Sequence, residues 1–169
     1  LDDPFNEGLS GLNYLLPCLQ SHSPLDMLVI MLGTNDCKER FSLTGANIAL
    51  GMRRLVIKAL GANVWRDKPN ILIIAPGPIL KECENSAVGS NMGKCSDKSY
   101  KLSMEYKFVA DELKVGFFDA APYVVMNDID FMHLTADSHI SLAKKVSEII
   151  KETLENKANF FSTEFIDML

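Results

Sequence analysis

The chain has 169 residues, of which 47% are hydrophobic and 23% are charged, a balance that is typical of one globular domain with a real core. The formal net charge of −5 and the lack of a basic stripe argue against nucleic acid as a partner. No apolar run approaches the roughly 20 residues that cross a bilayer. We therefore expect no membrane span and a cytoplasmic protein, although a chain that begins with Leu1 leaves open a removed leader.

In chain order, the apolar spacing predicts a helix over 9–19, a strand at 27–32, a helix over 48–60, a strand at 71–74, a helix over 102–113, a strand at 115–118 and a helix over 140–154. The strand runs are continuously apolar, as in parallel sheets covered on both faces. This alternation predicts a three-layer α/β domain with right-handed crossovers. The domain is expected to span residues 1–157, followed by an apolar tail at 158–169.

Two segments interrupt this alternation. Residues 78–96 are rich in Gly, Ser and Asn, and we expect a structureless loop that is either functional or disordered. The tail could dock on the body, dock on another subunit or fray. Three strands are also few for such a sheet, so we expect a strand–helix–strand unit upstream of Leu1.

The four cysteines are not dense enough to indicate a disulfide framework, and no C-x-x-C motif occurs. Reduced thiols are the expected state. Cys83 and Cys95 lie in or beside the same long loop, so a bond between them remains an alternative.

A polar group follows the first predicted strand. Gly33 allows a tight turn, and Asn35 could then point its side-chain amide into the crevice at the carboxyl end of the sheet, where open α/β sheets bind ligands. Such an amide can stabilise a developing oxyanion. The alternative is that Thr34, Asn35 or Asp36 simply caps the next helix.

A carboxylate and an imidazole lie three positions apart near the end of the chain. If the segment turns helically, Asp130 can accept a hydrogen bond from Nδ1–H of His133 and leave Nε2 free as a general base. Asp128 could compete for this orienting role, and a surface ion pair is the simpler alternative.

The remaining histidines have ordinary explanations. His139 follows Asp137 at the start of the last helix and is expected to be structural, and His22 suits the end of the first helix. A metal site formed by Asp130, His133, Asp137 and His139 is a weak alternative because this spacing matches no known ligand pattern. We therefore predict no metal and no cofactor.

No serine in the chain has the surroundings of a nucleophile. Ser10, in Gly8-Leu9-Ser10-Gly11, is one residue short of the G-x-S-x-G elbow and lies in a helical pattern. The serines in or beside the long loop, Ser86, Ser90, Ser96 and Ser99, follow no strand. The site predicted from this chain thus has a base and an oxyanion donor but lacks a nucleophile.

The segments 25–36 (LDMLVIMLGTND) and 130–139 (DFMHLTADSH) resemble the third and last conserved blocks of the SGNH (GDSL-type) serine esterases and lipases. The opening Asp2-Asp3-Pro4-Phe5-Asn6-Glu7-Gly8, followed by Gly11-Leu12, is similar to the arylesterase and acyltransferase branch of that family. The resemblance runs through most of residues 1 to about 155. The first block (Gly-Asp-Ser, with the nucleophile) and the second have no counterpart in this sequence.

The resemblance implies a flavodoxin-like α/β/α fold, without its N-terminal strand unit in this chain. It also implies a Ser-His-Asp ester hydrolase acting on small esters, with His133 as base, Asp130 as its orienting carboxylate and Asn35 as oxyanion donor. The serine would come from an upstream segment, and homo-oligomers are known in this branch. The alternative is a non-catalytic α/β binding or scaffold module.

Overall fold

The computed structural model describes residue 5 and residues 7–166, and it describes side chains up to residue 155. Four residues of the opening segment that resembles the arylesterase branch, Asp2, Asp3, Pro4 and Asn6, lie outside this range, as do residues 167–169 of the predicted tail.

The sheet is formed by β1 (Leu28–Ile30), β2 (Ile71–Ala75) and β3 (Gly116–Asp119), in that spatial order. All of its pairings are parallel, with Val29 opposite Leu72 and Ile73 opposite Phe117. Every residue of β2 is buried, as expected for a central strand covered on both faces. The three predicted strands and the α/β fold class are therefore confirmed.

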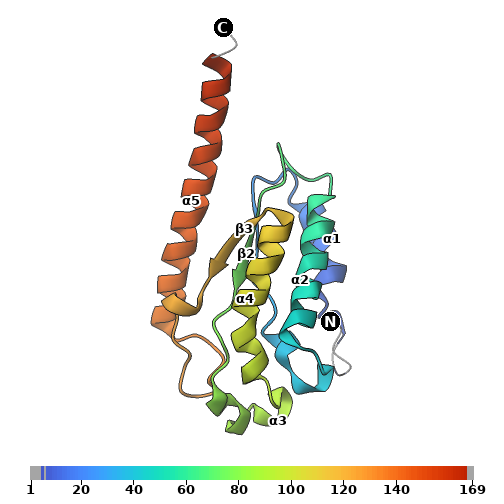
Figure 1. Ribbon diagram of the computed structural model, residues 1–169, viewed down its shortest axis with the longest axis vertical. Coiled ribbons are helices and arrows are strands. Elements are labelled where there is room, and N and C mark those ends of the chain that lie inside the picture. Colours follow the sequence, from blue (N-terminus) through green and yellow to red (C-terminus); the bar gives the residue numbers. More distant parts are fainter. Residues whose placement is uncertain (1–4, 6, 167–169) are drawn as a thin grey trace.

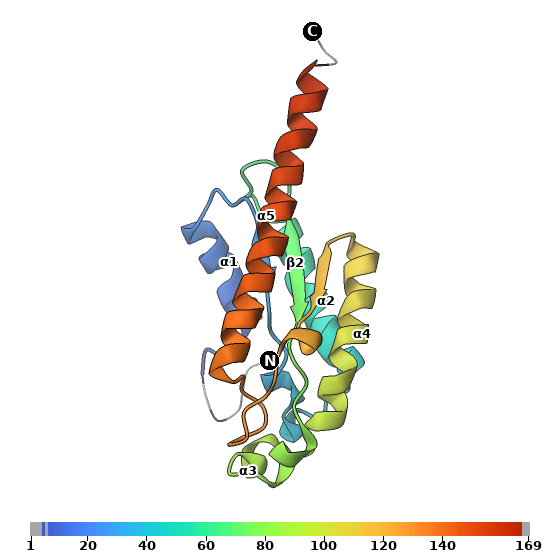
Figure 2. The ribbon, with the colours of Figure 1, turned by 90° about the vertical axis from the view of Figure 1, so that its left-hand side faces the viewer.

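Helices cover the two faces of the sheet (Figures 1 and 2). On one face, α1 (Gly11–Ser21), α2 (Gly45–Leu60) and α4 (Ser96–Leu113) contribute to a large core that includes Ile71 and Ile73. On the other face, α5 (Ala136–Ile166) packs Leu142, Val146 and Ile149 against Leu72, Ile74 and Phe118. Odd and even positions of β2 thus enter different cores, because successive side chains of a strand point to opposite faces.

The segment 78–96 is ordered by short elements, so the expectation of a structureless loop is wrong. It contains the 3₁₀ helix η3 (Lys81–Asn85) and the short helix α3 (Gly89–Met92). The carboxylate of Glu84 accepts hydrogen bonds from the amide and hydroxyl of Ser96, at 3.2 and 2.6 Å. Such side-chain bonds order a segment without producing apolar periodicity, which explains why the pattern gave no sign of them.

The last helix continues through residues 158–166, so the described part of the predicted tail is helical. Its distal half extends well beyond the body of the domain (Figure 1). Within the described residues, no helix is both long enough and apolar enough to cross a bilayer.

All four cysteines are free thiols. Burial raises the pKa of Cys37 and of Cys95 to about 12, and burial also raises the pKa of Cys83. These thiols are therefore protonated at neutral pH, and the alternative of a Cys83–Cys95 bond is not what the structure contains.

Candidate active site

The segments with candidate site residues emerge from the same end of the sheet. The turn after β1 continues into η1 (Asn35–Cys37) and η2 (Glu39–Phe41), and the loop after β3 continues through η4 (Ala121–Tyr123) to residue 135. In Figure 1 both segments lie at the lower end of the domain, near α3. This is the carboxyl edge of the sheet, where parallel α/β folds bind ligands.

The turn that carries Asn35 depends on Gly33 and Tyr106. Gly33 has φ of +124°, and a Cβ atom there would overlap the Tyr106 hydroxyl. That hydroxyl donates a 2.9 Å hydrogen bond to the carbonyl of Leu32. A buried tyrosine of α4 thus fixes the last carbonyl before the turn, and Gly33 is the residue that fits beside it.

The capping interpretation of this segment is wrong. Thr34 precedes η1 in helical conformation and makes no side-chain capping bond within the described residues. The next α-helix, α2, is instead capped by Thr44, whose hydroxyl accepts a 3.1 Å hydrogen bond from the amide of Asn47. Asn35 itself is exposed and is the first residue of η1 rather than its N-cap.

Asp130 and His133 are in direct contact, with Nδ1 of His133 lying 2.7 Å from Oδ2 of Asp130. The contact does not arise from a helical turn. Oδ1 of Asp130 accepts hydrogen bonds from the amides of Met132 and His133, each at 3.0 Å, and Phe131 between them has φ of +61°. The carboxylate therefore folds the chain back over itself and brings the ring to its second oxygen.

These contacts favour the ionised carboxylate. Burial opposes ionisation of Asp130, whose side chain is 17% exposed, but the His133 amide, the His133 ring and the Met132 amide outweigh it and lower the pKa of Asp130 to about 2. An ionised Asp130 selects the tautomer with hydrogen on Nδ1 and leaves Nε2 as the available acceptor. Asp128 is exposed and does not hold Nδ1.

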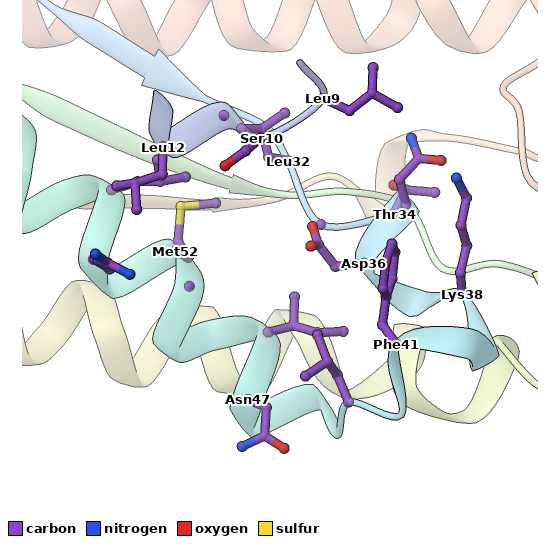
Figure 3. A pocket seen from close by; sticks show the side chains of 18 of the residues that line it. Leu9, Ser10, Leu12, Leu32, Thr34, Asp36, Lys38, Phe41, Asn47 and Met52 are labelled. Carbon is purple, nitrogen blue, oxygen red and sulfur yellow. The ribbon is translucent and has the colours of Figure 1, made fainter. Parts of the chain in front are cut away.

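A hollow of about 650 Å³ lies beside the turn that carries Asn35. Leu12 and Met52 line one end of it and Lys38 and Phe41 the other, with Asp36 between them (Figure 3). Asn35 belongs to its lining, whereas Asp130 and His133 do not. The structure thus places all three predicted residues at one edge of the sheet, with Asn35 in the lining of the hollow and the pair Asp130 and His133 (the dyad) outside it.

The hollow begins just beyond the end of β1, at Met31. This strand pairs with β2 on one side, and the described residues provide no strand on its other side. Just beyond β1, Met31 and Leu32 are 42% and 48% exposed and line the hollow. An unpaired strand edge beside exposed apolar side chains is a surface that proteins normally cover.

We compared the chain with known proteins by sequence and by fold. No family model and no curated protein sequence matches the chain. Among solved structures, the native aryl esterase of M. smegmatis is 32% identical, with a TM-score of 0.82 over 90% of this chain and 72% of that one. Est24, a carbohydrate acetylesterase from Sinorhizobium meliloti, is 36% identical, with a TM-score of 0.80 over 90% and 73%.

The chain belongs to the SGNH hydrolase family. Its relatives within the family are arylesterases and carbohydrate acetylesterases. A further carbohydrate acetylesterase family member from Sinorhizobium meliloti is 28% identical, with a TM-score of 0.82 over 91% of this chain and 74% of that chain. The expected family and fold are therefore confirmed.

Two residues that shape this candidate site were not identified from the sequence. Tyr106 was expected only as one apolar position of a helix, and Asn127 was not singled out. Asn127 follows the bridge residue Met126 and accepts hydrogen bonds within the dyad loop. An Asx residue in a loop is a turn signal, which was the available clue. No group of three or more His, Cys, Asp or Glu side chains in the described part of the chain is arranged to hold a metal.

Proposed function

We propose that this chain forms most of a carboxylic-ester hydrolase that acts through a Ser-His-Asp triad on small esters. The observation that supports this most is the 2.7 Å contact between Nδ1 of His133 and Oδ2 of Asp130, at the same edge of the sheet as Asn35. Its solved relatives are an aryl esterase and carbohydrate acetylesterases, which suggests aryl or acetyl esters as the first substrates to test.

The proposed reaction assigns one step to each residue. Nε2 of His133 removes the proton from a serine hydroxyl as the serine oxygen attacks the ester carbonyl, and Asp130 stabilises the resulting imidazolium. The side-chain amide of Asn35 donates to the oxyanion of the tetrahedral intermediate. His133 then protonates the departing alcohol, and water or a second alcohol takes the acyl group from the serine.

The serine is proposed to arrive on a segment upstream of Leu1. Its strand would run beside β1, cover Met31 and Leu32 and occupy the hollow. A strand in that place would end at the carboxyl edge of the sheet, which is where a nucleophile must lie to reach His133. This arrangement also accounts for the open edge of β1 and for the share of the aryl esterase that this chain does not match.

The decisive variant is His133→Ala in a protein that includes the upstream coding region. Loss of a general base lowers turnover by about 10²- to 10⁴-fold, so we expect hydrolysis of phenyl acetate to fall by that factor. His139→Ala is the matched control, because His139 is exposed in the first turn of α5 and is expected to change little. Equal rates for both variants and the parent protein would refute the assignment.

A non-catalytic binding or scaffold module is the second candidate, and the lack of a serine after any strand of this chain favours it. A fluorophosphonate probe separates the two candidates. Labelling of one serine in the extended protein supports the esterase, whereas a well-folded extended protein that takes up no label supports the module.

A further inference from the structure

The dyad lies in a segment that has almost no regular structure. Residues 128–133 form turns and bends, enclosed by an isolated antiparallel bridge between Met126 and Leu134. Neither a helix nor a sheet therefore fixes the distance between Asp130 and His133. The bridge ties the two ends of the loop by backbone bonds, and side-chain hydrogen bonds must hold the residues between them.

One residue of this loop contacts the backbone at both Asp130 and His133, through its side chain at the first and through its main chain at the second. Oδ1 of Asn127 accepts hydrogen bonds from the amide of Ile129 at 2.8 Å and from the amide of Asp130 at 2.9 Å. The backbone N–H of Asn127 donates a 2.8 Å bond to the carbonyl of His133, as part of the bridge between Met126 and Leu134. The side chain of Asn127 thus holds the chain that enters Asp130, whereas the bond at His133 needs only its main chain.

We propose that Asn127 is a positioning residue that sets the orientation of the Asp130–His133 pair. It acts through backbone contacts and is not itself placed against the reacting atoms. The inference rests on the proposed function, because an orientation is of use only if His133 serves as the base.

The hydrogen bonds of Asp130 explain why a second residue is needed. Oδ1 of Asp130 is already used by the amides of Met132 and His133, and Oδ2 holds the ring. The carboxylate can therefore hold the chain that follows it but not the chain that precedes it. Asn127 supplies that missing constraint by fixing the amide of Asp130.

A contact with the segment around Leu80 also holds the loop, at Phe131. The carbonyl of Phe131 accepts a 3.0 Å hydrogen bond from the amide of Leu80, and Phe131 keeps a left-handed backbone with φ of +61°. A phenylalanine adopts that conformation only when its surroundings impose it. Without the side chain of Asn127, Phe131 can relax toward negative φ. Asp130 then turns away from the His133 ring, even though the bond between the Leu80 amide and the Phe131 carbonyl persists.

The test uses the extended protein with phenyl acetate as substrate and compares Asn127→Ala with Asn127→Asp. The alanine variant loses the acceptor for two amides, whereas the aspartate keeps an oxygen in the same place. A misplacement of about 1 Å can cost about 10²-fold in rate, so we expect kcat to fall about 10- to 100-fold in Asn127→Ala with little change in KM. Asn127→Asp should recover most of that loss.

Asn70→Ala is the matched control for loss of an asparagine hydrogen bond. The side-chain amide of Asn70 donates a 3.3 Å hydrogen bond to the carbonyl of Asp26. Asn70 precedes β2, so this bond lies at the opposite end of the sheet from the dyad. Urea unfolding of all variants separates a stability effect from a positioning effect. If Asn127→Ala does not fold, Asn127→Ser, which keeps a shorter acceptor, takes its place in the comparison.

Two results would overturn the inference. One is a kcat of Asn127→Ala equal to that of Asn70→Ala while His133→Ala is inactive, which leaves the proposed function intact. The other is a kcat of Asn127→Asp as low as that of Asn127→Ala, because the acceptor oxygen would then not be the cause. Full activity of His133→Ala is a different outcome, which removes the proposed function and this inference together.

Discussion

At the scale of single residues, the turn after β1 depends on a contact that leaves no room for a side chain. Substitution of Gly33 by Ala places a Cβ at the Tyr106 hydroxyl and keeps a positive φ of +124°. Strain of this kind costs about 1–3 kcal/mol, and the overlap adds to it. We expect Gly33→Ala to lower the free energy of unfolding in urea by at least this amount.

A double-mutant cycle identifies the cause of that loss. Tyr106→Phe removes the hydroxyl and hence the overlap, so Gly33→Ala should cost less in the Tyr106→Phe background than in the parent protein. The matched control is Gly61→Ala, because Gly61 has φ of −82° and a Cβ there would make an ordinary 3.7 Å contact. If Gly33→Ala were as mild as Gly61→Ala, the turn would not need its glycine.

The same scale shows how far the sequence predicted the site. The spacing of Asp130 and His133 indicated their pairing, but the expected helical turn was the wrong route to it. The pairing is produced by two amides that bond to Asp130 and by the positive φ of Phe131. The positive φ of Phe131 has no sequence signal, because left-handed backbone is rare for phenylalanine, whereas the bonds to Asp130 form the kind of turn that an Asx residue favours. The roles of Asn35, Asp130 and His133 in catalysis stay predictions.

At the scale of elements, every long helix and strand was predicted, whereas the short elements were not. Continuous apolar runs and helical spacing identify β2 and α2 because burial imposes those patterns. By contrast, η3 and α3 are held by bonds from Glu84, Ser86 and Ser96. Their residues are as polar as those of a loop, so the composition predicted a loop.

Glu84 is the element-scale residue whose role can be tested by pH. The hydroxyl of Ser96, then Lys81 and the Ser96 amide, outweigh burial and lower the pKa of Glu84 from 4.5 to about 2. Because the folded state favours the charged form, this contribution is complete above pH 4.5. It is lost as the pH falls from about 4.5 to about 2.

We therefore expect Glu84→Gln to lower the free energy of unfolding by about 1–3 kcal/mol at pH 7, as for a hydrogen-bonded charge. The difference between the variant and the parent protein should shrink across that acidic range. Urea titrations at several pH values measure it. Glu112→Gln is the control, because Glu112 pairs with Arg53 while 51% exposed and such pairs contribute at most about 1 kcal/mol. A pH-independent effect of Glu84→Gln would contradict the assignment.

At the scale of the whole molecule, the two faces of the sheet are covered, but the outer edge of β1 is not paired with a strand in the described residues. Cores on both sides of β2 join α1, α2 and α4 on one face and α5 on the other. The hollow beside β1 is the place where this packing stops, with Leu32 48% exposed. A strand that filled it would complete both the sheet and the proposed site, so stability and activity should depend on the same surface.

Leu32→Asp tests that dependence because it should be tolerated in the chain alone but not in the extended protein. In the 169-residue chain alone, Leu32 faces an open hollow, so the substitution should leave the urea midpoint nearly unchanged. It should also reduce the fluorescence of anilinonaphthalene sulfonate, a dye that binds exposed apolar surface.

In a protein with the upstream segment, the substitution would bury an unpaired carboxylate against the added strand, at a cost of several kcal/mol. Esterase activity should then fall together with stability. Leu50→Asp is the control, because Leu50 is 59% exposed on α2 outside the lining of the hollow and should be tolerated in both contexts. Equal tolerance of Leu32→Asp in the extended protein would mean that the added segment lies elsewhere.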